Sequence, residues 1–331
     1  MAIKIGFIGV GGIAHSHLSR LSQIKEARIV ALCDVVKQKA EESAKTYQAI
    51  AYTDYKEMLK REDLDAVFIC LPPFAHGDIE IDLAQRGIPF FIEKPVNLYL
   101  KKAKKVEKIV KEKSLITSAG YVLRYMDIVE KAKDFLRGKK IALVLGRYFG
   151  EVPGGGKGWY ARKEKSGGQI VEQVTHIVDL MRYLAGEVDY LYAQGFRGLN
   201  KLENYNVEDA SIVAFHFKNG AIGSLTSNWL LSGYQSILEI ITKGIQVRYC
   251  VTSLEIISKN KKEEFLVSND YALLEDRIFL EAVKNNNPAK IKSDYRDALK
   301  TLEVTLAANE SMEKKKIISL PRLENFLQRS L

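Results

Sequence analysis

Short runs of wholly apolar residues alternate with amphipathic segments in the first third of the chain, and no other feature restricts the fold as strongly. A strand that is apolar along its whole length is buried on both faces, and intervening helices make the crossovers of a parallel sheet. We therefore predict a doubly wound α/β domain over residues 1–121. Its strands are predicted at 3–9, 28–34, 65–71, 88–92 and 115–120, and its helices near 12–22, 36–47, 75–86 and in the lysine-rich segment after residue 100.

The pattern changes near residue 122, after which most predicted strands follow one another directly. Asn219-Gly220 has the strong preference of a two-residue hairpin turn and joins two of these strands. We predict that residues 122–331 form an α+β domain built on a large, mainly antiparallel sheet. Its strands are predicted at 141–150, 188–197, 207–217, 220–229, 236–242, 245–251 and 253–257, and its helices near 125–137, 169–185, 271–285 and 294–313.

The helices of this second domain suffice to cover only one face of its sheet. The other face carries apolar residues such as Ile212 and Ala214 beside His216. An extended apolar face on a soluble protein marks a contact with a partner. We therefore expect a homodimer or homotetramer that assembles through the sheet of the second domain.

A glycine-rich turn follows the first predicted strand and opens the first predicted helix. It reads Gly9-Val-Gly11-Gly-Ile-Ala14, the form GxGxxA, and Asp34 ends the next strand about 20 residues further on. Gly9 permits the tight turn, Gly11 lets the backbone approach a pyrophosphate, and Ala14 allows close packing of the helix on the strand. The pattern predicts a Rossmann domain whose cofactor site includes Gly9, Gly11, Gly12, Ile13, Ala14 and Asp34.

The choice between NAD and NADP depends on the residues at the end of the second strand. The Asp34 carboxylate can accept hydrogen bonds from the ribose hydroxyls, and it repels a 2′-phosphate. We therefore expect NAD. Lys37 and Lys39 follow closely and could attract a phosphate, so NADP stays possible.

Two further strands of the parallel sheet end in residues suited to a site, because ligands bind at the carboxyl ends of such strands. Leu71 and Pro72 end the third strand, with His76 just after them, although His76 could simply belong to the first turn of the next helix. Glu93 and Lys94 end the fourth strand. A lysine there is suited to exchange a proton with a hydroxyl, and Glu93 could orient or tune it. The alternative for Glu93 and Lys94 is an ordinary surface ion pair.

The predicted helix at 169–185 carries a polar face opposite its apolar stripe. Glu172, His176 and Asp179 are spaced i, i+4 and i+7, so they share that face. This arrangement permits an acid–base histidine held by carboxylates, a metal site, or a solvated polar face. We expect no metal, because hydride transfer between an alcohol and a nicotinamide needs none.

These motifs, in this order, make the chain similar to the Gfo/Idh/MocA family, the glucose–fructose oxidoreductase and inositol dehydrogenase-like enzymes. The resemblance implies a Rossmann domain followed by an α/β domain whose sheet often mediates oligomerisation. It also implies that Lys94 and His176 serve acid–base chemistry on a hydroxyl of a sugar or cyclitol, and that NAD or NADP exchanges the hydride. The motifs that carry the resemblance are GVGGIA (9–14), Asp34, LPPFAH (71–76), EKP (93–95), GYVLRY (120–125) and the GG…H-I-V-D helix.

The chain departs from the family pattern in that helix. Where the pattern resembles GGGxxxDxGxH, this chain has Gln169 for the third glycine, Glu172 for the aspartate and Val174 for the inner glycine. Glu172 keeps the charge but is one methylene longer, so the hydroxyl that it would hold must lie differently. The departure weakens the case for myo-inositol itself as the substrate, though not the case for dehydrogenase chemistry.

The resemblance also points to three further substrate-site residues, Tyr121, Arg124 and Trp159, although each could equally serve packing. Two rival functions stay open. A sugar-nucleotide 3-dehydrogenase could bind its diphosphate with the lysines of GGGKGWYARKEK (154–165). A non-catalytic NAD(P)-binding regulatory protein could share the fold, but the presence of both Lys94 and His176 favours an enzyme.

The net charge of +9 does not indicate a nucleic-acid partner. Much of the excess lies in the runs 101–113, 259–264 and 313–316, where glutamates are interspersed and aromatic residues are absent. No run approaches ~18 consecutive apolar residues, so we expect no membrane span. Of the three cysteines, Cys33 and Cys70 lie in apolar strands and read as buried thiols, which suits a cytoplasmic protein.

Overall fold

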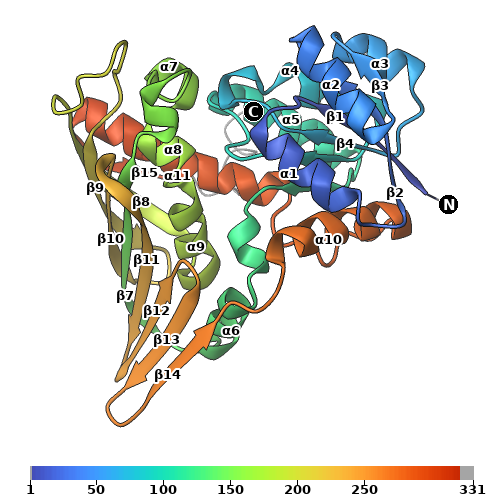
Figure 1. Ribbon diagram of the computed structural model, residues 1–331. Coiled ribbons are helices and arrows are strands. Elements are labelled where there is room, and N and C mark those ends of the chain that lie inside the picture. Colours follow the sequence, from blue (N-terminus) through green and yellow to red (C-terminus); the bar gives the residue numbers. More distant parts are fainter. Residues whose placement is uncertain (1, 321–331) are drawn as a thin grey trace, which may run out of the picture. The chain divides into compact units, whose positions relative to one another are not determined.

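Figure 1 shows the computed structural model of the protein, which describes residues 2–320. By its internal contacts the chain divides into two compact units. The first comprises the residues up to Tyr125 together with Asp270–Leu299, and the second comprises Met126–Asn269 and the residues from Lys300 onward. Each unit is therefore assembled from two separate stretches of the sequence.

A six-stranded parallel sheet forms the centre of the first unit, which confirms the predicted doubly wound fold (Figure 1). The strands lie in the order β3-β2-β1-β4-β5-β6, so the strand order reverses beside β1. Strand β3, three residues long at the edge of the sheet, was not predicted. The strands are β1 (Ile3–Ile8), β2 (Ala27–Cys33), β3 (Ile50–Tyr52), β4 (Ala66–Ile69), β5 (Phe90–Ile92) and β6 (Thr117–Ala119).

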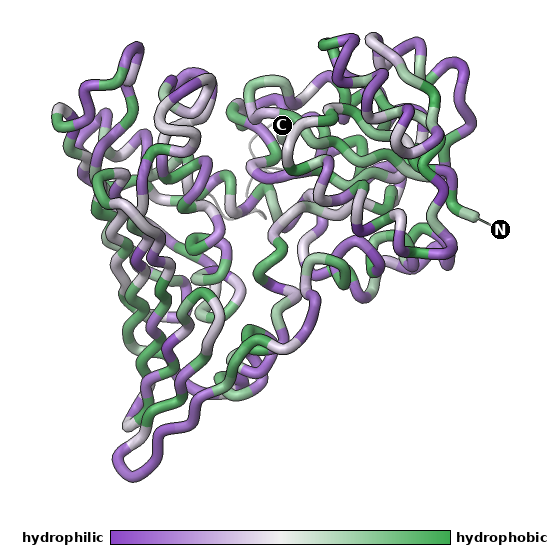
Figure 2. Tube along the Cα trace, in the orientation of Figure 1, coloured by the Kyte–Doolittle hydropathy of each residue, from purple (hydrophilic) through white to green (hydrophobic). Residues whose placement is uncertain are grey.

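The core of the first unit is a stack of aromatic rings on the central strands. Phe7 of β1 and Phe91 of β5 each stack on Phe68 of β4 with ring centroids 5.0 Å apart. All three side chains are fully buried, and Figure 2 shows hydrophobic residues along these inner strands. The helices of the unit are α1 (Gly12–Leu21), α2 (Lys37–Tyr47), α3 (Tyr55–Arg61), α4 (Asp78–Arg86), α5 (Leu100–Glu112) and α10 (Tyr271–Asn285), with the short 3₁₀ turns η1 (Pro73–Ala75) and η2 (Val122–Tyr125).

Helix α10 belongs to the first unit, whereas its segment was predicted to lie in the second domain, over residues 122–331. Its Phe279 is fully buried and meets Phe68 edge-on, with ring centroids 5.4 Å apart. The same ring lies 5.9 Å from Phe91. The helix returns to the first unit because its apolar face completes the aromatic core of the parallel sheet.

A nine-stranded sheet forms the second unit and is mainly antiparallel, as predicted, with one parallel pair between β7 and β10. The strand order is β14-β13-β12-β11-β7-β10-β9-β8-β15, of which β14 and β15 were not predicted. Gly220 has a positive φ of 85° in the predicted turn between β9 and β10. The strands are β7 (Ile141–Glu151), β8 (Val188–Phe196), β9 (Ala210–Phe217), β10 (Ile222–Asn228), β11 (Leu230–Thr242), β12 (Ile245–Cys250), β13 (Ser253–Ser258), β14 (Lys262–Leu266) and β15 (Ile318–Ser319).

Helices pack on one face of this sheet (Figure 1). A Cβ at Gly146 of β7 would lie 3.0 Å from Ile177 and 3.2 Å from Met181 of α9, so the glycine allows that helix to approach closely. The helices are α6 (Asp127–Leu136), α7 (Lys163–Ser166), α8 (Gln169–Glu172), α9 (Thr175–Ala185) and α11 (Tyr295–Lys314), which spans the division between the units, and η3 (Pro153–Gly156) is a short 3₁₀ turn. Within residues 2–320, no helix combines the length and apolar character needed to span a membrane.

The single helix predicted at 169–185 is interrupted, and this expectation was wrong in detail. The break lies at Gln173–Val174, between α8 and α9. The backbone N–H of Val174 donates to the carbonyl of Gln169, five residues back, instead of to the fourth. This wide turn separates a short first segment, which carries Glu172, from the long helix, which carries His176.

Candidate active site

The carboxyl ends of four adjacent strands of the first unit lie along one edge of its sheet. Asp34 follows β2, Gly9 follows β1, Leu71 comes shortly after β4 and Glu93 follows β5. Backbone hydrogen bonds continue the sheet past the strand ends, since Gly9 donates to the Cys33 carbonyl and Glu93 to the Ile69 carbonyl. The structure therefore brings the predicted cofactor residues of the first unit together along one edge.

The glycine-rich turn has the geometry of a pyrophosphate site. Gly9 has a φ of +87°, and a Cβ there would lie 2.8 Å from Leu71 and still closer to the carbonyl oxygen of Cys70. By contrast, a Cβ on Gly11 or Gly12 would meet nothing within 4 Å. Helix α1 begins at Gly12 without a side-chain cap, so its first N–H groups, including those of Ile13 and Ala14, are available to an anion. These residues fit a dinucleotide.

Two backbone N–H groups hold the side chain of Asp34 in place. Its carboxylate accepts hydrogen bonds from the N–H of Val10 at 3.0 Å and the N–H of Val36 at 2.9 Å. This position suits the adenosine ribose, because each carboxylate oxygen keeps a further lone pair.

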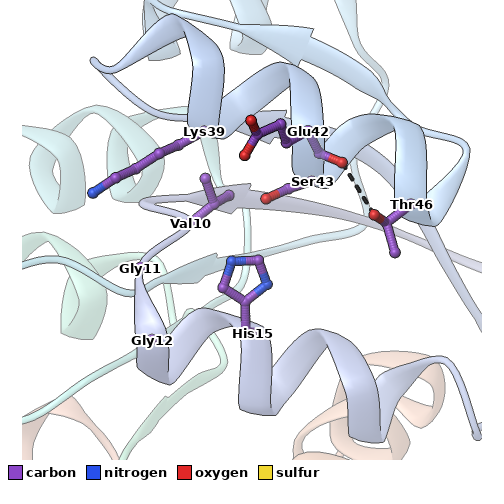
Figure 3. Close-up of a pocket in the computed structure, with 8 residues that line it drawn as sticks. All are labelled: Val10, Gly11, Gly12, His15, Lys39, Glu42, Ser43 and Thr46. Atoms are coloured by element: carbon purple, nitrogen blue, oxygen red, sulfur yellow. Dashed lines mark hydrogen bonds between the residues drawn. The ribbon is translucent and has the colours of Figure 1, made fainter.

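A cavity of about 390 Å³ opens beside the glycine turn, between α1 and α2 (Figure 3). Lys39 of α2 lines it, whereas Lys37 lies 3.6 Å from Glu41 on the surface. Of the two lysines considered for a phosphate, Lys39 is therefore the one beside the turn. The cavity is lined by Val10, Gly11, Gly12, His15, Lys39, Glu42, Ser43 and Thr46.

His76 is buried within the turn that follows β4, where Pro72 leads into η1. Its Nδ1 lies 2.5 Å from a carboxylate oxygen of Glu80, and its Nε2 lies 3.1 Å from the carbonyl oxygen of Leu71. The other oxygen of Glu80 accepts from the N–H of Gly77. These contacts engage both ring nitrogens inside the turn and favour a structural role for His76 over direct contact with a cofactor.

Glu93 turns inward directly after β5, while Lys94, the next residue, is partly exposed. A carboxylate oxygen of Glu93 lies 3.0 Å from Nε2 of His17, and Nδ1 of His17 lies 2.6 Å from Asp276 of α10. Burial alone would lower the pKa of His17, but the carboxylates of Asp276 and Glu93 raise it to about 9. Burial alone would raise the pKa of Glu93, but the contact with His17 holds it below its usual value. Sequence reasoning found neither His17 nor Asp276.

The second unit gathers aromatic and acidic groups around α8. Trp159 stacks on Tyr160 with ring centroids 3.8 Å apart and 25° between the planes. Burial, and then the charge of Glu172, raise the pKa of Tyr160 to about 12. Glu172 is itself 4% exposed. His176 is partly exposed in the first turn of α9. The predicted site residues Glu172 and His176 therefore lie on α8 and at the start of α9.

Two glutamines that sequence reasoning did not assign to the site contribute to its geometry. Gln169, which replaces a glycine of the family pattern, is fully buried and accepts a hydrogen bond of 2.6 Å from the hydroxyl of Ser227 on β10. Gln173 is partly exposed and accepts one of 2.8 Å from the hydroxyl of Tyr148 on β7. The two contacts tie α8 and the wide turn to the sheet beneath them, and thereby fix the place of Glu172.

Other predicted substrate residues make structural contacts. Asp179 is 1% exposed and accepts a hydrogen bond of 2.9 Å from the hydroxyl of Thr301 on α11. Arg124, in the first unit, donates to the carbonyl of Lys292 and pairs with Asp297, both at 2.6 Å. Tyr121 is buried in the same unit. These contacts favour the packing alternative for Tyr121 and Arg124.

The lysines proposed for a diphosphate are not all available. Lys163, in the segment after the glycine-rich loop, pairs with Glu208 and lies 3.9 Å from Glu313. This pairing weakens the sugar-nucleotide alternative, because two carboxylates already balance that ammonium group.

The first unit is a doubly wound domain with an open glycine turn, and the second is a large sheet with helices on one face. This combination is typical of two-domain NAD-binding oxidoreductases. Residues 3–121 match the family described as "Oxidoreductase family, NAD-binding Rossmann fold", and residues 139–247 match the "GFO/IDH/MocA C-terminal domain". The chain belongs to the GFO/IDH/MocA oxidoreductase family, which confirms the resemblance drawn from its motifs.

Relatives extend the match over most of the chain. The protein is 30% identical to the uncharacterised Schizosaccharomyces pombe protein UNK4.17, over 84% of this chain and 79% of that protein. It is 27% identical to the myo-inositol 2-dehydrogenase of Thermotoga maritima, over 96% of this chain and 98% of that enzyme. Levoglucosan dehydrogenase, solved in complex with NADH, shares the fold with a TM-score of 0.89 at 18% identity, over 98% of this chain and 100% of that one.

Proposed function

We propose that the protein is an NAD-dependent dehydrogenase that interconverts a secondary alcohol and a ketone on a cyclitol or sugar ring. The observation that carries the proposal is the place of Lys94, which is partly exposed and is the second residue after β5. Strand β5 lies two strands from β1 and its glycine turn, along the same edge of the sheet. The relative named myo-inositol 2-dehydrogenase supports the substrate class.

The protein's own groups bind the cofactor and move the proton. When bound, NAD would supply the hydride-transfer chemistry in either direction. The uncapped N–H groups of α1 would hold the pyrophosphate, and Asp34 would accept hydrogen bonds from the ribose hydroxyls. As the carbon loses its hydride, Lys94 or His176 takes the hydroxyl proton. The reaction then balances, because the alcohol and NAD become the ketone, NADH and one proton.

The second unit offers groups that suit a polyhydroxylated ring. The Trp159–Tyr160 pair presents aromatic surface, on which the C–H face of a sugar or cyclitol can stack. Glu172 supplies a carboxylate that accepts from ring hydroxyls. Because Lys163 is already paired with glutamates, an uncharged sugar or a cyclitol fits better than a sugar nucleotide.

Turnover on a panel of cyclitols and sugars with NAD tests this proposal. Lys94→Ala and His176→Ala should each lower kcat by roughly 10²–10⁴ while NADH binding stays nearly intact. The double variant should lose much less than the product of the two effects, because residues that act as one unit are not additive. Lys108→Ala is the matched control, since that lysine is exposed on α5 and pairs only loosely with Glu112, at 3.8 Å.

Two outcomes would contradict the proposal. Near-normal turnover by Lys94→Ala would remove the lysine from the chemistry and leave His176 as the proton carrier. NADH binding without turnover on any member of the panel would instead support the rival, a regulatory protein that binds the cofactor.

The open face of the nine-stranded sheet supports a homo-oligomer. Tyr190, His216 and Ile222 are neighbours on β8, β9 and β10, and Ile222 pairs in turn with Leu143 of β7. Ile222 is 57% exposed and Ile212, on the same face, is 50% exposed. We infer that a second copy covers this face, in a dimer or tetramer. Light scattering should give a multiple of the chain mass, and Ile212→Glu should dissociate the assembly; a monomeric parent protein would contradict it.

We also infer that the protein works in the cytoplasm. Cys33 and Cys70 are buried free thiols, and Cys250 is also unpaired. Thiols kept reduced are typical of that compartment. Fractionation of the native cells, with the protein detected by antibody, tests the assignment, and recovery outside the cytoplasm would overturn it.

A further inference from the structure

A line of alternating charges runs beneath the end of β5 in the first unit. Arg20 donates from Nε to Asp276 at 2.7 Å, Asp276 lies 2.6 Å from Nδ1 of His17, and Nε2 of His17 lies 3.0 Å from Glu93. The His17 ring is 1% exposed, and Asp276 is fully buried. The line ends at Lys94, whose backbone N–H donates to the second oxygen of Glu93 at 3.2 Å.

The two carboxylates require His17 to be an imidazolium. A neutral imidazole has one N–H and one acceptor nitrogen, so it cannot donate to Asp276 and Glu93 together. Nη2 of Arg20 also lies 2.9 Å from Nδ1, and its positive charge opposes this protonation. Two carboxylates outweigh one guanidinium, and the raised pKa of His17, about 9 after the cost of burial, agrees with the geometry.

Three neighbours confine the Glu93 carboxylate. One oxygen faces His17, the other faces the backbone of Lys94, and a Cβ on Gly120 would lie 2.9 Å from it. Its backbone N–H is bonded to the carbonyl of Ile69 on β4. A carboxylate held this way fixes the main chain at the residue where β5 ends.

We propose that His17 and Asp276 are positioning residues for Lys94, acting through Glu93. The imidazolium holds the Glu93 carboxylate in place and balances its negative charge, and Asp276 keeps the imidazole protonated. The lysine is thereby fixed at the end of β5 without an unbalanced carboxylate next to its ammonium group. This inference rests on the proposed role of Lys94 in proton transfer, and it adds two residues that do not touch the substrate.

Chemical labelling of Lys94 tests the charge balance without substrate or cofactor. Acetic anhydride acylates the neutral amine, so the pH dependence of Lys94 acetylation, read by peptide mass spectrometry, reports how tightly the amine holds its proton. In His17→Gln the Glu93 carboxylate loses its imidazolium partner. Because this carboxylate interacts electrostatically with the Lys94 ammonium group, acetylation of Lys94 at a fixed pH should slow by at least about 10-fold. Acetylation of Lys108 in the same digest is the internal reference.

A second substitution distinguishes charge balance from a loss of structure. In His17→Gln combined with Glu93→Gln, the unbalanced carboxylate is gone, so acetylation of Lys94 should return towards the parent rate. Leu18→Ala is the matched control, because Leu18 is a fully buried neighbour on α1 that does not belong to the line of charges. It should lower the free energy of unfolding, because it leaves a cavity in the core, and leave the labelling of Lys94 unchanged.

Kinetics supply the second readout. His17→Gln should lower kcat by at least about 10-fold and leave the KM for NAD within a few-fold, since the charge line does not touch the glycine turn. If His17→Gln does not fold, Asp276→Asn keeps the shape of the side chain and carries the same expectation. Unchanged labelling of Lys94 in these variants, or the same slow labelling in Leu18→Ala, would overturn the inference. If the labelling of Lys94 slows in these variants but the parent protein turns over no substrate, the inference about His17 and Asp276 stands and the proposed dehydrogenase activity is refuted.

Discussion

Alanine at Gly9 should destabilise the fold before any cofactor is added. The residue has a φ of +87°, and its Cβ would lie 2.8 Å from Leu71 and closer still to the carbonyl oxygen of Cys70. A left-handed backbone costs an L-residue about 1–2 kcal/mol, and overpacking a filled interior costs about 1–3 kcal/mol. The free energy of unfolding of Gly9→Ala should therefore fall by about 2–5 kcal/mol.

Alanine at Gly11 should act on binding instead. Its φ is −77°, which any residue adopts, and its Cβ would meet nothing within 4 Å. The loss of stability should stay within about 1 kcal/mol, the range for a change at a helix N-cap. The added methyl group would occupy the space beside the first N–H groups of α1, so NADH affinity should fall at least about 10-fold, or 1.4 kcal/mol.

Two measurements separate the two glycines. Urea unfolding followed by circular dichroism, without cofactor, gives the stability of each variant, and titration of NADH fluorescence gives its affinity. We expect a large stability loss for Gly9→Ala, and a binding loss with near-normal stability for Gly11→Ala. A Gly9→Ala protein as stable as the parent, or a Gly11→Ala protein that binds NADH normally, would refute this account of the turn.

Three further predictions concern cofactor choice, core packing and the protonation of His17 in the first unit. Asp34→Ala should weaken NAD binding and raise the kcat/KM ratio of NADP to NAD; a parent protein that already prefers NADP would contradict it. Phe279→Ala should lower the free energy of unfolding by about 3–5 kcal/mol in urea titrations, because it empties the aromatic core; a loss below about 1 kcal/mol would argue against the place of α10. Burial opposes protonation of His17, but the carboxylates of Asp276 and Glu93 raise its pKa from 6.5 to about 9. The protonated ring therefore stabilises the fold fully below pH 6.5, and this contribution is lost as the pH rises through 9. That loss, about 3 kcal/mol in urea titrations across this range, should be absent in His17→Gln.

The parallel sheet and its strand ends could be predicted because their signals are local. Apolar runs marked five of its six strands, and GxGxxA followed a strand and opened a helix, so the glycine turn needed no tertiary information. Strand β3 was missed because its three residues are exposed or only partly buried, whereas those of the equally short β5 and β6 are buried. The break in the helix at Gln173–Val174 was missed because both residues permit a regular helix, and the contacts of Gln169 and Gln173 with the sheet are not visible in the periodicity.

The partners of the predicted residues could not be read from the sequence. His17 and Asp276 are separated by 259 positions and meet only because α10 returns to the first unit. The spacing predicted that Glu172, His176 and Asp179 share one face of a single helix, but the wide turn at Gln173–Val174 separates Glu172 from α9, and the hydrogen bond of Asp179 to Thr301 depends on where α11 packs. Periodicity gives the face of a helix, whereas the neighbour of that face is decided by the tertiary fold.

The return of α10 also affects how the chain can fold during translation. A nascent chain that has emerged as far as Tyr125 has all six strands of the parallel sheet but lacks the helix that covers Phe68 and Phe91. The second unit is equally incomplete, because it also draws on residues from Lys300 onward. The first unit cannot reach its final packing until Asp270–Leu299 has left the ribosome, and the second cannot until residues beyond Lys300 have followed. Chains that stop early would expose an uncovered aromatic surface and so become substrates for chaperones and proteases.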